Sequence, residues 1–216
     1  RSLEEAAGWC VAFAVALKRH LRGEPLALSP RGAVGPAATS STDSYRSDAT
    51  LLHGLLSERQ LSRLEASSHP PEHAIAGLRV CLRTFLSQSS SEEHLKVSLS
   101  MLFNQSTDGF IGALTGCERI LGTPPPLTYV GVLRSIILVW LILLPFSMVH
   151  ELRWWTLVIN VVVATTLLIV EEIAAEIENP FGRDPYDLPL NALCRSVEAG
   201  ALRFVDEHAE LVAGRL

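Results

Sequence analysis

The segment YVGVLRSIILVWLILLPFSMV, which runs from Tyr129 to Val149, decides the fold class of this chain. It contains a single charged residue, Arg134, and is otherwise dominated by aliphatic and aromatic side chains. As an α-helix, at about 1.5 Å per residue, it would be about 31 Å long. That length matches the hydrocarbon core of a lipid bilayer, which is about 30 Å thick. The segment therefore predicts a transmembrane helix over residues 128–149.

A second apolar run follows almost at once. The stretch WWTLVINVVVATTLLIV, from Trp154 to Val170, has no charged residue. It would form a helix about 26 Å long, at the short end for a membrane span. Trp154 and Trp155 stand at its start, where the aromatic belt of a membrane interface would lie. A buried hairpin in a large soluble core is the alternative, but two such runs in succession favour a second transmembrane helix over residues 154–171.

The two predicted spans are joined by the short turn His150–Arg153 and form a hairpin, so both flanking segments lie on one side of the membrane. Arg119 and Arg183 lie in these flanks, and Arg153 lies in the turn. Positively charged residues favour the cytosolic side, so we expect the flanks in the cytosol, or in the stroma of a plastid.

The composition agrees with a membrane protein. Hydrophobic residues make up 48% of the chain and charged residues 19%, whereas soluble proteins average about 25% charged residues. The net charge of −5 offers no basic surface for nucleic acid. The four cysteines contain no CxxC pair, so we expect buried or unpaired thiols and no zinc or redox centre built from them.

The aqueous parts are predicted to be helical. We expect a cytosolic helix within residues 1–24, from Leu3 to Arg22, that ends at Gly23. Residues 25–71 are expected to form a flexible insertion with one short helix at 51–64. Residues 72–127 are expected to hold further cytosolic helices, at Glu72–Leu86, Glu92–Phe103 and Gly109–Leu121.

A cluster of basic residues ends the first predicted helix and comprises Lys18, Arg19, His20 and Arg22. Cations at the carboxyl end of a helix complement the helix dipole, and we prefer that interpretation. Contact with lipid headgroups is the alternative.

Residues 172–216 are predicted to form a cytosolic turn and a C-terminal helix. The helix carries an apolar stripe made of Leu190, Leu193, Cys194, Val197, Ala201, Phe204, Val205 and Leu211. Such a stripe is too large to stay exposed in a stable monomer, so we expect it to pack between neighbouring subunits or onto the aqueous helices. The acidic stretch Glu171–Glu178 is interpreted as a solvated helix face, with salt bridges between subunits as the alternative.

No catalytic constellation is visible in the sequence. Motifs of the GxSxG, HExxH, P-loop and GxGxxG types are absent. The seven histidines are scattered and are interpreted as surface or core residues. We therefore predict no enzymatic activity and no required cofactor.

The string ENPFGRDPYDLPL, from Glu178 to Leu190, follows the second span. Pro180 is expected to end the preceding helix, because a proline pushes the residue before it out of the helical region. Gly182 is expected to turn the chain, and Asp187 to cap the next helix, with Pro189 in its first turn. The string would then act as a rigid collar that positions the last helix.

Two motifs resemble the bestrophin-like anion channel family. GCERILGTPPPLTYV, at Gly116–Val130, is similar to the segment before the third membrane helix of bacterial and plant-type members, and Glu171–Glu198 is similar to the segment after the fourth. The motif residues are Gly116, Cys117, Glu118, Arg119, Asn179, Pro180, Phe181, Gly182, Leu188 and Pro189. The resemblance extends from about Glu92 to Leu211. Counterparts of only the third and fourth membrane helices are visible, from which we expect an N-terminally truncated chain.

The resemblance implies an all-α membrane protein, with a transmembrane hairpin and cytosolic helices, that forms a homopentamer around a central pore. The implied partners are the lipid bilayer, further copies of the chain and small anions, namely chloride and also bicarbonate. A membrane-anchored interaction or structural protein without a working pore is the alternative. The DLPL form of the turn is typical of the bacterial and plastid types, and the low-complexity insertion favours a eukaryotic alga or plant. We therefore expect a thylakoid or other plastid membrane.

Animal members of this family follow NPFG with a dense acidic run that binds calcium. Here only Asp184 and Asp187 are carboxylates, and Arg183 places a cation beside them. With the carbonyl of Asn179 or Glu178 they would form a degenerate calcium site, although calcium takes about 6–8 oxygen ligands. We prefer the structural interpretation of this turn and expect conduction that does not depend on calcium.

Overall fold

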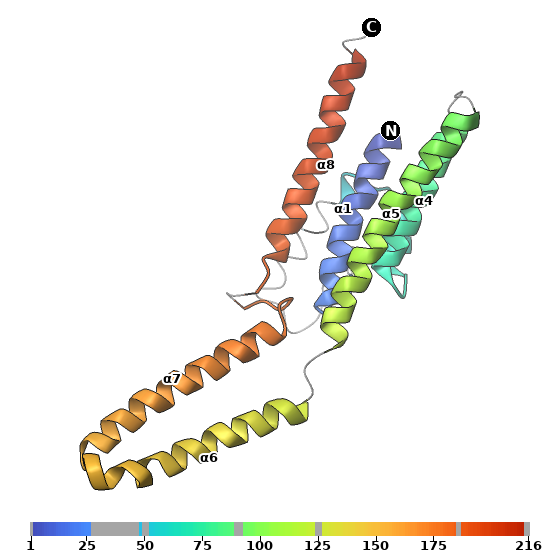
Figure 1. Cartoon of the computed structure of the whole chain (residues 1–216). Helices are drawn as coiled ribbons and strands as arrows, with labels where there is room; N and C mark the ends of the chain where they lie inside the picture. Colours follow the sequence, from blue (N-terminus) through green and yellow to red (C-terminus); the bar gives the residue numbers. More distant parts are fainter. Residues whose placement is uncertain are drawn as a thin grey trace. The chain divides into compact units, whose positions relative to one another are not determined.

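The computed structural model describes residues 2–26, 48, 52–88, 93–123, 127–184 and 187–213. All the regular elements in this part of the chain are α-helices, which confirms the all-α prediction (Figure 1). They are α1 (Ser2–Leu21), α3 (Glu58–Glu65), α4 (Pro70–Gln88), α5 (Glu93–Gly122), α6 (Leu127–Leu152), α7 (Trp155–Glu178) and α8 (Leu190–Ala213). The chain divides into two compact units, one of residues 1–119 and 189–216, the other of residues 120–188.

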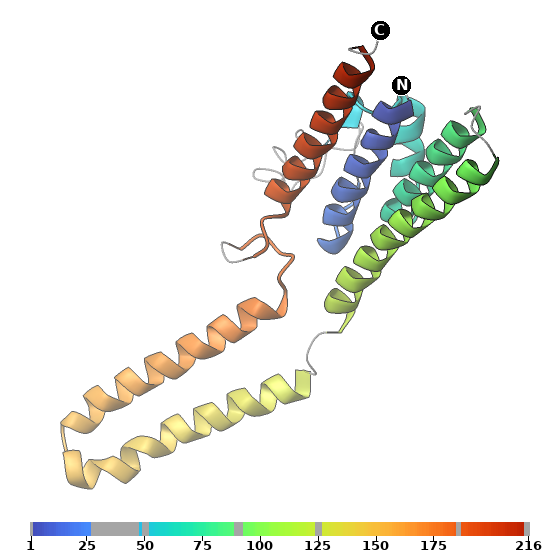
Figure 2. The same ribbon diagram turned by 45° about the horizontal axis from the view of Figure 1, so that its top comes forward.

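Helix α1 is the centre of the first unit. It packs against α4 and against α8 (Figure 2). Its side chains are buried on several faces. Val11 and Ala12, on successive positions, are both fully inaccessible to solvent. The helix ends as predicted, because Gly23 adopts a positive φ of 63° and its N–H donates to the His20 carbonyl at 3.0 Å.

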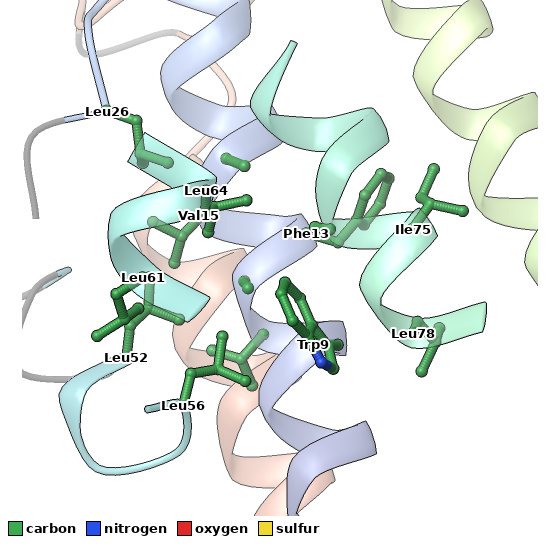
Figure 3. Packing of buried hydrophobic residues seen from close by; sticks show 14 of the residues in the cluster. Trp9, Phe13, Val15, Leu26, Leu52, Leu56, Leu61, Leu64, Ile75 and Leu78 are labelled. Atoms are coloured by element: carbon green, nitrogen blue, oxygen red, sulfur yellow. The ribbon is translucent and has the colours of Figure 1, made fainter. Parts of the chain in front are cut away.

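The core between α1 and α4 depends on one close approach. The ring of Trp9 in α1 lies directly over Gly77 in α4, and an added Cβ at Gly77 would be 2.6 Å from three ring atoms. Figure 3 shows Trp9 and Phe13 of α1 pointing toward Ile75 and Leu78 of α4. Because glycine has no side chain, the two helices can approach and the indole can be buried.

Helix α5 is one continuous helix, so the prediction of two helices at Glu92–Phe103 and Gly109–Leu121 is wrong. The polar residues between the predicted helices do not break it, since Thr107 is buried and its hydroxyl donates to the Asn104 carbonyl at 2.9 Å. Arg79 of α4 donates to Thr107 at 3.2 Å, and the Phe13 and Phe110 rings meet edge to face at 4.9 Å. These contacts hold α5 on α4 and α1.

The described part of the expected flexible insertion belongs to the core. Leu52, Leu56, Leu61 and Leu64 are buried there with residues of α1 (Figure 3). Helix α3 is shorter than the predicted helix at 51–64, because Ser57 starts it with a reciprocal capping box to Gln60. Residues 27–47 and 49–51 of the predicted insertion lie outside the described residues.

The basic end of α1 does more than complement the helix dipole. Lys18 and Arg19 are only 3% and 2% exposed, and both bind the buried carboxylate of Asp48. The Lys18 Nζ atom donates to Asp48 Oδ1 at 2.5 Å, and Arg19 Nε donates to Oδ2 at 2.8 Å. Lys18 and Arg19 lie in the last turn of α1, as the dipole interpretation expects, but they are also part of a buried ion-pair cluster and do not face lipid headgroups. Buried charges need such pairing to offset the cost of their desolvation.

Helix α8 runs antiparallel to α1 and contacts it (Figures 1 and 2). Leu190 and Cys194 are buried, and the Cys194 thiol donates to the Ala14 carbonyl at 3.4 Å. Further along the stripe, Leu193 and Phe204 are exposed at 51% and 59%. The stripe is thus only partly covered within one chain.

Helices α6 and α7 form the antiparallel hairpin of the second unit (Figure 1). Both are longer than the predicted spans and leave a turn of two residues, Arg153 and Trp154. Arg153 takes a positive φ of 46°, which closes this tight turn. The buried hydroxyl of Thr156 donates to the Met148 carbonyl at 3.3 Å and fastens α7 to the end of α6.

Candidate functional site

The hairpin presents an apolar surface over most of its length. Its two long apolar stretches, Tyr129–Leu152 and Trp155–Ala174, have mean hydropathies of 2.3 and 2.1 and are not buried within the chain. Trp154 and Trp155, at the turn, are exposed at 88% and 68%. A soluble protein does not leave such a surface in water, so lipid or other membrane helices must cover it.

One face of α6 combines small and large side chains. A shallow groove of about 660 Å³ lies along it and is lined by Gly131, Val132, Ser135, Ile136, Val139, Trp140 and Leu143. Small residues such as Gly131 and Ser135 let helix backbones approach closely in membranes. This face is therefore suited to packing against another membrane helix.

The charge in the first span has a partner in the second. Arg134 of α6 forms an ion pair with Glu171 of α7, through both its Nε and NH2 groups. An unpaired charge within a span is costly, and pairing lowers that cost. Glu171 thus belongs to an ion pair within the hairpin, which corrects its interpretation as part of a solvated acidic face.

The polar side chains in the middle of α7 fall into two groups. Thr165 and Thr166 donate to the carbonyls of Val161 and Val162 in their own helix, at 2.8 and 2.9 Å. The buried amide oxygen of Asn160 has no hydrogen-bond partner among the described residues. The threonines are satisfied within α7, whereas Asn160 has capacity for a contact from outside.

The turn after α7 is closed by backbone hydrogen bonds. Helix α7 ends at Glu178, and the Pro180 carbonyl accepts a hydrogen bond from the Leu188 N–H at 2.9 Å. The Asp187 N–H donates to the Asp184 carbonyl at 3.1 Å. Phe181 is buried. Asn179, the residue before Pro180, is already out of the helical conformation, as predicted.

The Asp187 side chain is hydrogen-bonded within this turn. Its Oδ2 atom accepts a hydrogen bond from the Asp184 N–H at 2.7 Å. The same atom would be 2.5 Å from a Cβ at Gly182, so only glycine leaves room for the carboxylate. The prediction that Asp187 caps the next helix is wrong, because α8 begins at Leu190 and the Pro189 carbonyl accepts from the Ala192 and Leu193 N–H groups.

The predicted calcium ligands Asp184 and Asp187 lie within this turn. The turn engages Asp187 Oδ2, whereas Asp184 is exposed. Among the described residues, neither aspartate belongs to a group of three side chains able to hold a metal ion. Calcium needs about 6–8 oxygen ligands, so the residues present fit a structural turn better than a calcium site.

The GCER motif lies near the end of α5. Gly116 has open space around it, and Arg119 is exposed. Burial raises the pKa of the Cys117 thiol, and the neighbouring Glu118 carboxylate raises it further. Glu118 reaches across to α1, where its Oε1 atom is 2.9 Å from His20 Nε2.

Sequence reasoning missed one cluster around Glu118. The rings of His20 and His69 lie beside each other with centroids 4.7 Å apart. The three residues are far apart in the sequence and form no motif, so only their convergence in the fold reveals them. Cys10, Cys81, Cys117 and Cys194 are all free thiols, and Cys81 and Cys194 are buried, in agreement with the expected buried or unpaired thiols.

Comparison with known proteins gives a consistent result. The model of the family described as "Bacterial/Fungal Bestrophin protein" matches residues 1–203. A voltage-dependent anion channel-forming protein of Nostoc sp. is 36% identical over 188 residues, which are 87% of this chain and 53% of the relative. The voltage-dependent anion channel-forming protein YneE of Escherichia coli K12 is 30% identical over 98% of this chain and 61% of the relative.

Solved structures agree with these relatives. A crystal structure of a bacterial bestrophin homologue from Klebsiella pneumoniae matches with a TM-score of 0.75 and 26% identity, over 94% of this chain and 66% of that chain. A second crystal structure of the homologue from that organism matches with a TM-score of 0.74, and the match covers 65% of the solved chain. The chain therefore spans between about half and two thirds of the length of these relatives.

Proposed function

Because this chain belongs to the bacterial/fungal bestrophin family, we propose that it is a subunit of a membrane channel for small anions. The observation that carries the proposal is its similarity, over most of its length, to proteins named as anion channel-forming. The apolar hairpin α6–α7 supplies membrane-spanning helices for such a protein. We propose chloride as a permeating ion, and bicarbonate as a further one.

The proposal does not require a tight anion site on the hairpin. A conducting pore must release ions as readily as it takes them up, so apolar constrictions and helix dipoles suffice. Arg134, the one charged residue of the first predicted span, is paired with Glu171, so it is not left as a lone cation that would trap an anion. The family relationship also agrees with the prediction that the protein is not an enzyme.

We propose that the channel is a homo-oligomer, and a homopentamer on the family resemblance. The exposed part of the α8 stripe, at Leu193, Val197 and Phe204, supports contact with another copy, since a single chain leaves these apolar side chains in water. The groove along α6 supports a further helix contact within the membrane.

We propose that the channel lies in a membrane. The relatives reported above are bacterial proteins, and none supports the predicted plastid membrane. A plastid location stays a prediction, which a fluorescent fusion in a plastid-bearing host would test. Fluorescence confined to the cell surface would contradict it.

The decisive experiment measures anion flux. The full-length natural protein is purified in detergent, its oligomeric mass is determined, and it is reconstituted into chloride-loaded liposomes. We expect chloride efflux well above that of empty vesicles, with no matching leak of a large anion such as gluconate. Intact oligomers that release chloride no faster than empty vesicles would refute the channel and favour a membrane-anchored protein without a pore.

A further inference from the structure

Three side chains from separate segments meet at one end of the first unit. His20 lies at the end of α1, His69 directly precedes α4, and Glu118 lies near the end of α5. One potential ligand atom from each residue lies within 4.8 Å of the other two. Each side chain is partly buried, so the cluster is shielded by protein while a small ion can still reach it.

One histidine nitrogen of the cluster has no hydrogen-bond partner among the described residues. His20 Nε2 and Glu118 Oε1 are paired at 2.9 Å. His69 Nδ1 is buried and has no hydrogen-bond partner in the described part of the chain. A buried polar atom without a partner is costly, and native proteins normally satisfy such atoms with a protein group, water or an ion. An ion pair between His20 and Glu118 alone does not explain the position of His69.

The backbone holds His69 in this place. Its carbonyl accepts the His73 N–H at 3.1 Å in the first turn of α4, and its own N–H donates to Ser67 Oγ at 3.2 Å. His20 is held by α1, whose neighbouring residues Lys18 and Arg19 are buried. Two imidazoles and a carboxylate are therefore brought together by rigid elements, which favours a preorganised site.

We propose that His20, His69 and Glu118 bind a divalent transition-metal ion, with zinc as the ion that fits best. Imidazole and carboxylate ligands suit zinc, and two histidines with one glutamate form a three-ligand set that leaves a fourth position for water. Zinc holds ligand atoms about 2.0–2.1 Å from the ion, so neighbouring ligand atoms lie about 3.3 Å apart. The present separations, up to 4.8 Å, require side-chain shifts of about 1 Å to close the site.

Zinc at this position ties together α1, the start of α4 and the end of α5. Because the ligands converge only in the folded chain, zinc binds the folded state and stabilises it by an amount that grows with the logarithm of the zinc concentration once this exceeds the dissociation constant. The role is that of a structural clasp, and it is independent of the anion channel proposed above.

Zinc binding is tested on the detergent-purified full-length protein after treatment with a chelator. When zinc is then added to the metal-free protein, we expect about one bound zinc per chain by elemental analysis and a rise in melting temperature. Cobalt, as a spectroscopic probe, should give the visible absorption of a low-coordinate site with nitrogen and oxygen ligands. The conservative variants His69→Gln and Glu118→Gln should bind zinc more than about 100-fold more weakly, since loss of even an outer-shell partner costs about 10–100-fold.

The matched control is His94→Gln, which removes an exposed histidine on α5 away from the cluster. It should keep the affinity and the cobalt spectrum of the unaltered protein. The variants are compared by helical circular dichroism and oligomeric mass before metal is added, so that loss of folding is recognised. Failure of the unaltered protein to bind zinc, or equal zinc binding by all four proteins, would overturn the proposal.

Discussion

Arg134 and Glu171 form an ion pair that joins the two helices of the membrane hairpin, although they are 37 positions apart in the sequence. Arg134 lies in the first span and Glu171 in the second. Each residue therefore supplies the counter-charge that the other needs near hydrocarbon, which makes the pair a testable feature of the hairpin.

We expect Arg134→Gln and Glu171→Gln each to lower the melting temperature of the detergent-purified protein by several degrees, because each leaves one uncompensated charge. The double variant should recover part of the loss, since neither charge then remains. Glu172→Gln, which removes an exposed neighbouring charge, is the control and should change little. Additive losses in the double variant would show that the two side chains are not coupled.

Gly77→Ala should disturb the core of the first unit. The added methyl group would overlap the Trp9 ring, which is 5% exposed and has little room to move. Overpacking of this kind costs about 1–3 kcal/mol, or roughly 2–10 °C in melting temperature for a protein of this size. Gly112→Ala, in open space on α5, should instead be neutral or slightly stabilising. Tryptophan fluorescence during heating measures both, and equal melting of the two variants would contradict the close approach.

Anion current should not depend on calcium. The Asp187 carboxylate accepts the Asp184 N–H, so calcium would have to compete with the turn for this oxygen. We expect equal currents in chelator and in micromolar calcium, both for the natural protein and for Asp184→Ala. A current that rises with calcium and loses this rise in Asp184→Ala would make the turn a calcium site.

The turn itself should depend on Asp187. Asp187→Ala removes the acceptor for the Asp184 N–H and should increase proteolytic cleavage within residues 179–188 by several-fold. Asp187→Asn keeps an acceptor oxygen and should be cleaved much less. Cleavage that is the same in both variants would show that this hydrogen bond does not hold the turn.

Phe204→Asp should weaken the proposed oligomer. Phe204 is 59% exposed in the single chain, and a charge at that position would be buried unpaired if another copy covers it. We expect dissociation to smaller species in size-exclusion chromatography with light scattering. Ala199→Asp adds the same group at an exposed position of α8 outside the apolar stripe and should leave the mass unchanged. An unaltered oligomer in Phe204→Asp would exclude this side chain from an interface.

The buried cysteines should make stability sensitive to alkaline pH. Burial raises the pKa of the Cys10, Cys81 and Cys194 thiols, whereas an unfolded thiol ionises near pH 8.5. Because folding opposes ionisation, the contribution of these thiols to the free energy of unfolding is fully present below about pH 8.5. It is lost as the pH rises toward the pKa values of the folded state. The melting temperature should fall above about pH 8.5, and replacement of the three cysteines by alanine should flatten that fall. Parallel pH curves for both proteins would contradict this linkage.

Much of the local structure follows from the sequence alone. A run such as Tyr129–Val149 has only one stable environment, because its backbone must be hydrogen-bonded and its side chains must leave water. The end of α1 at Gly23 and the end of α7 before Pro180 are equally local, since each depends on the backbone freedom of one residue. The break expected within α5 does not occur, and the reason is also local, because polar residues weaken a helix less than a proline does.

What the sequence determined by itself is therefore the class of the protein: an all-α chain with a hairpin that requires a membrane. The tertiary structure decided which distant residues meet. Lys18 and Arg19 find Asp48, Trp9 finds Gly77, and His20 finds His69 and Glu118 only when the helices pack. Periodicity specifies which face of a helix is apolar, but it carries no information on the partner of that face, because contacts between distant segments depend on the packing of the whole unit.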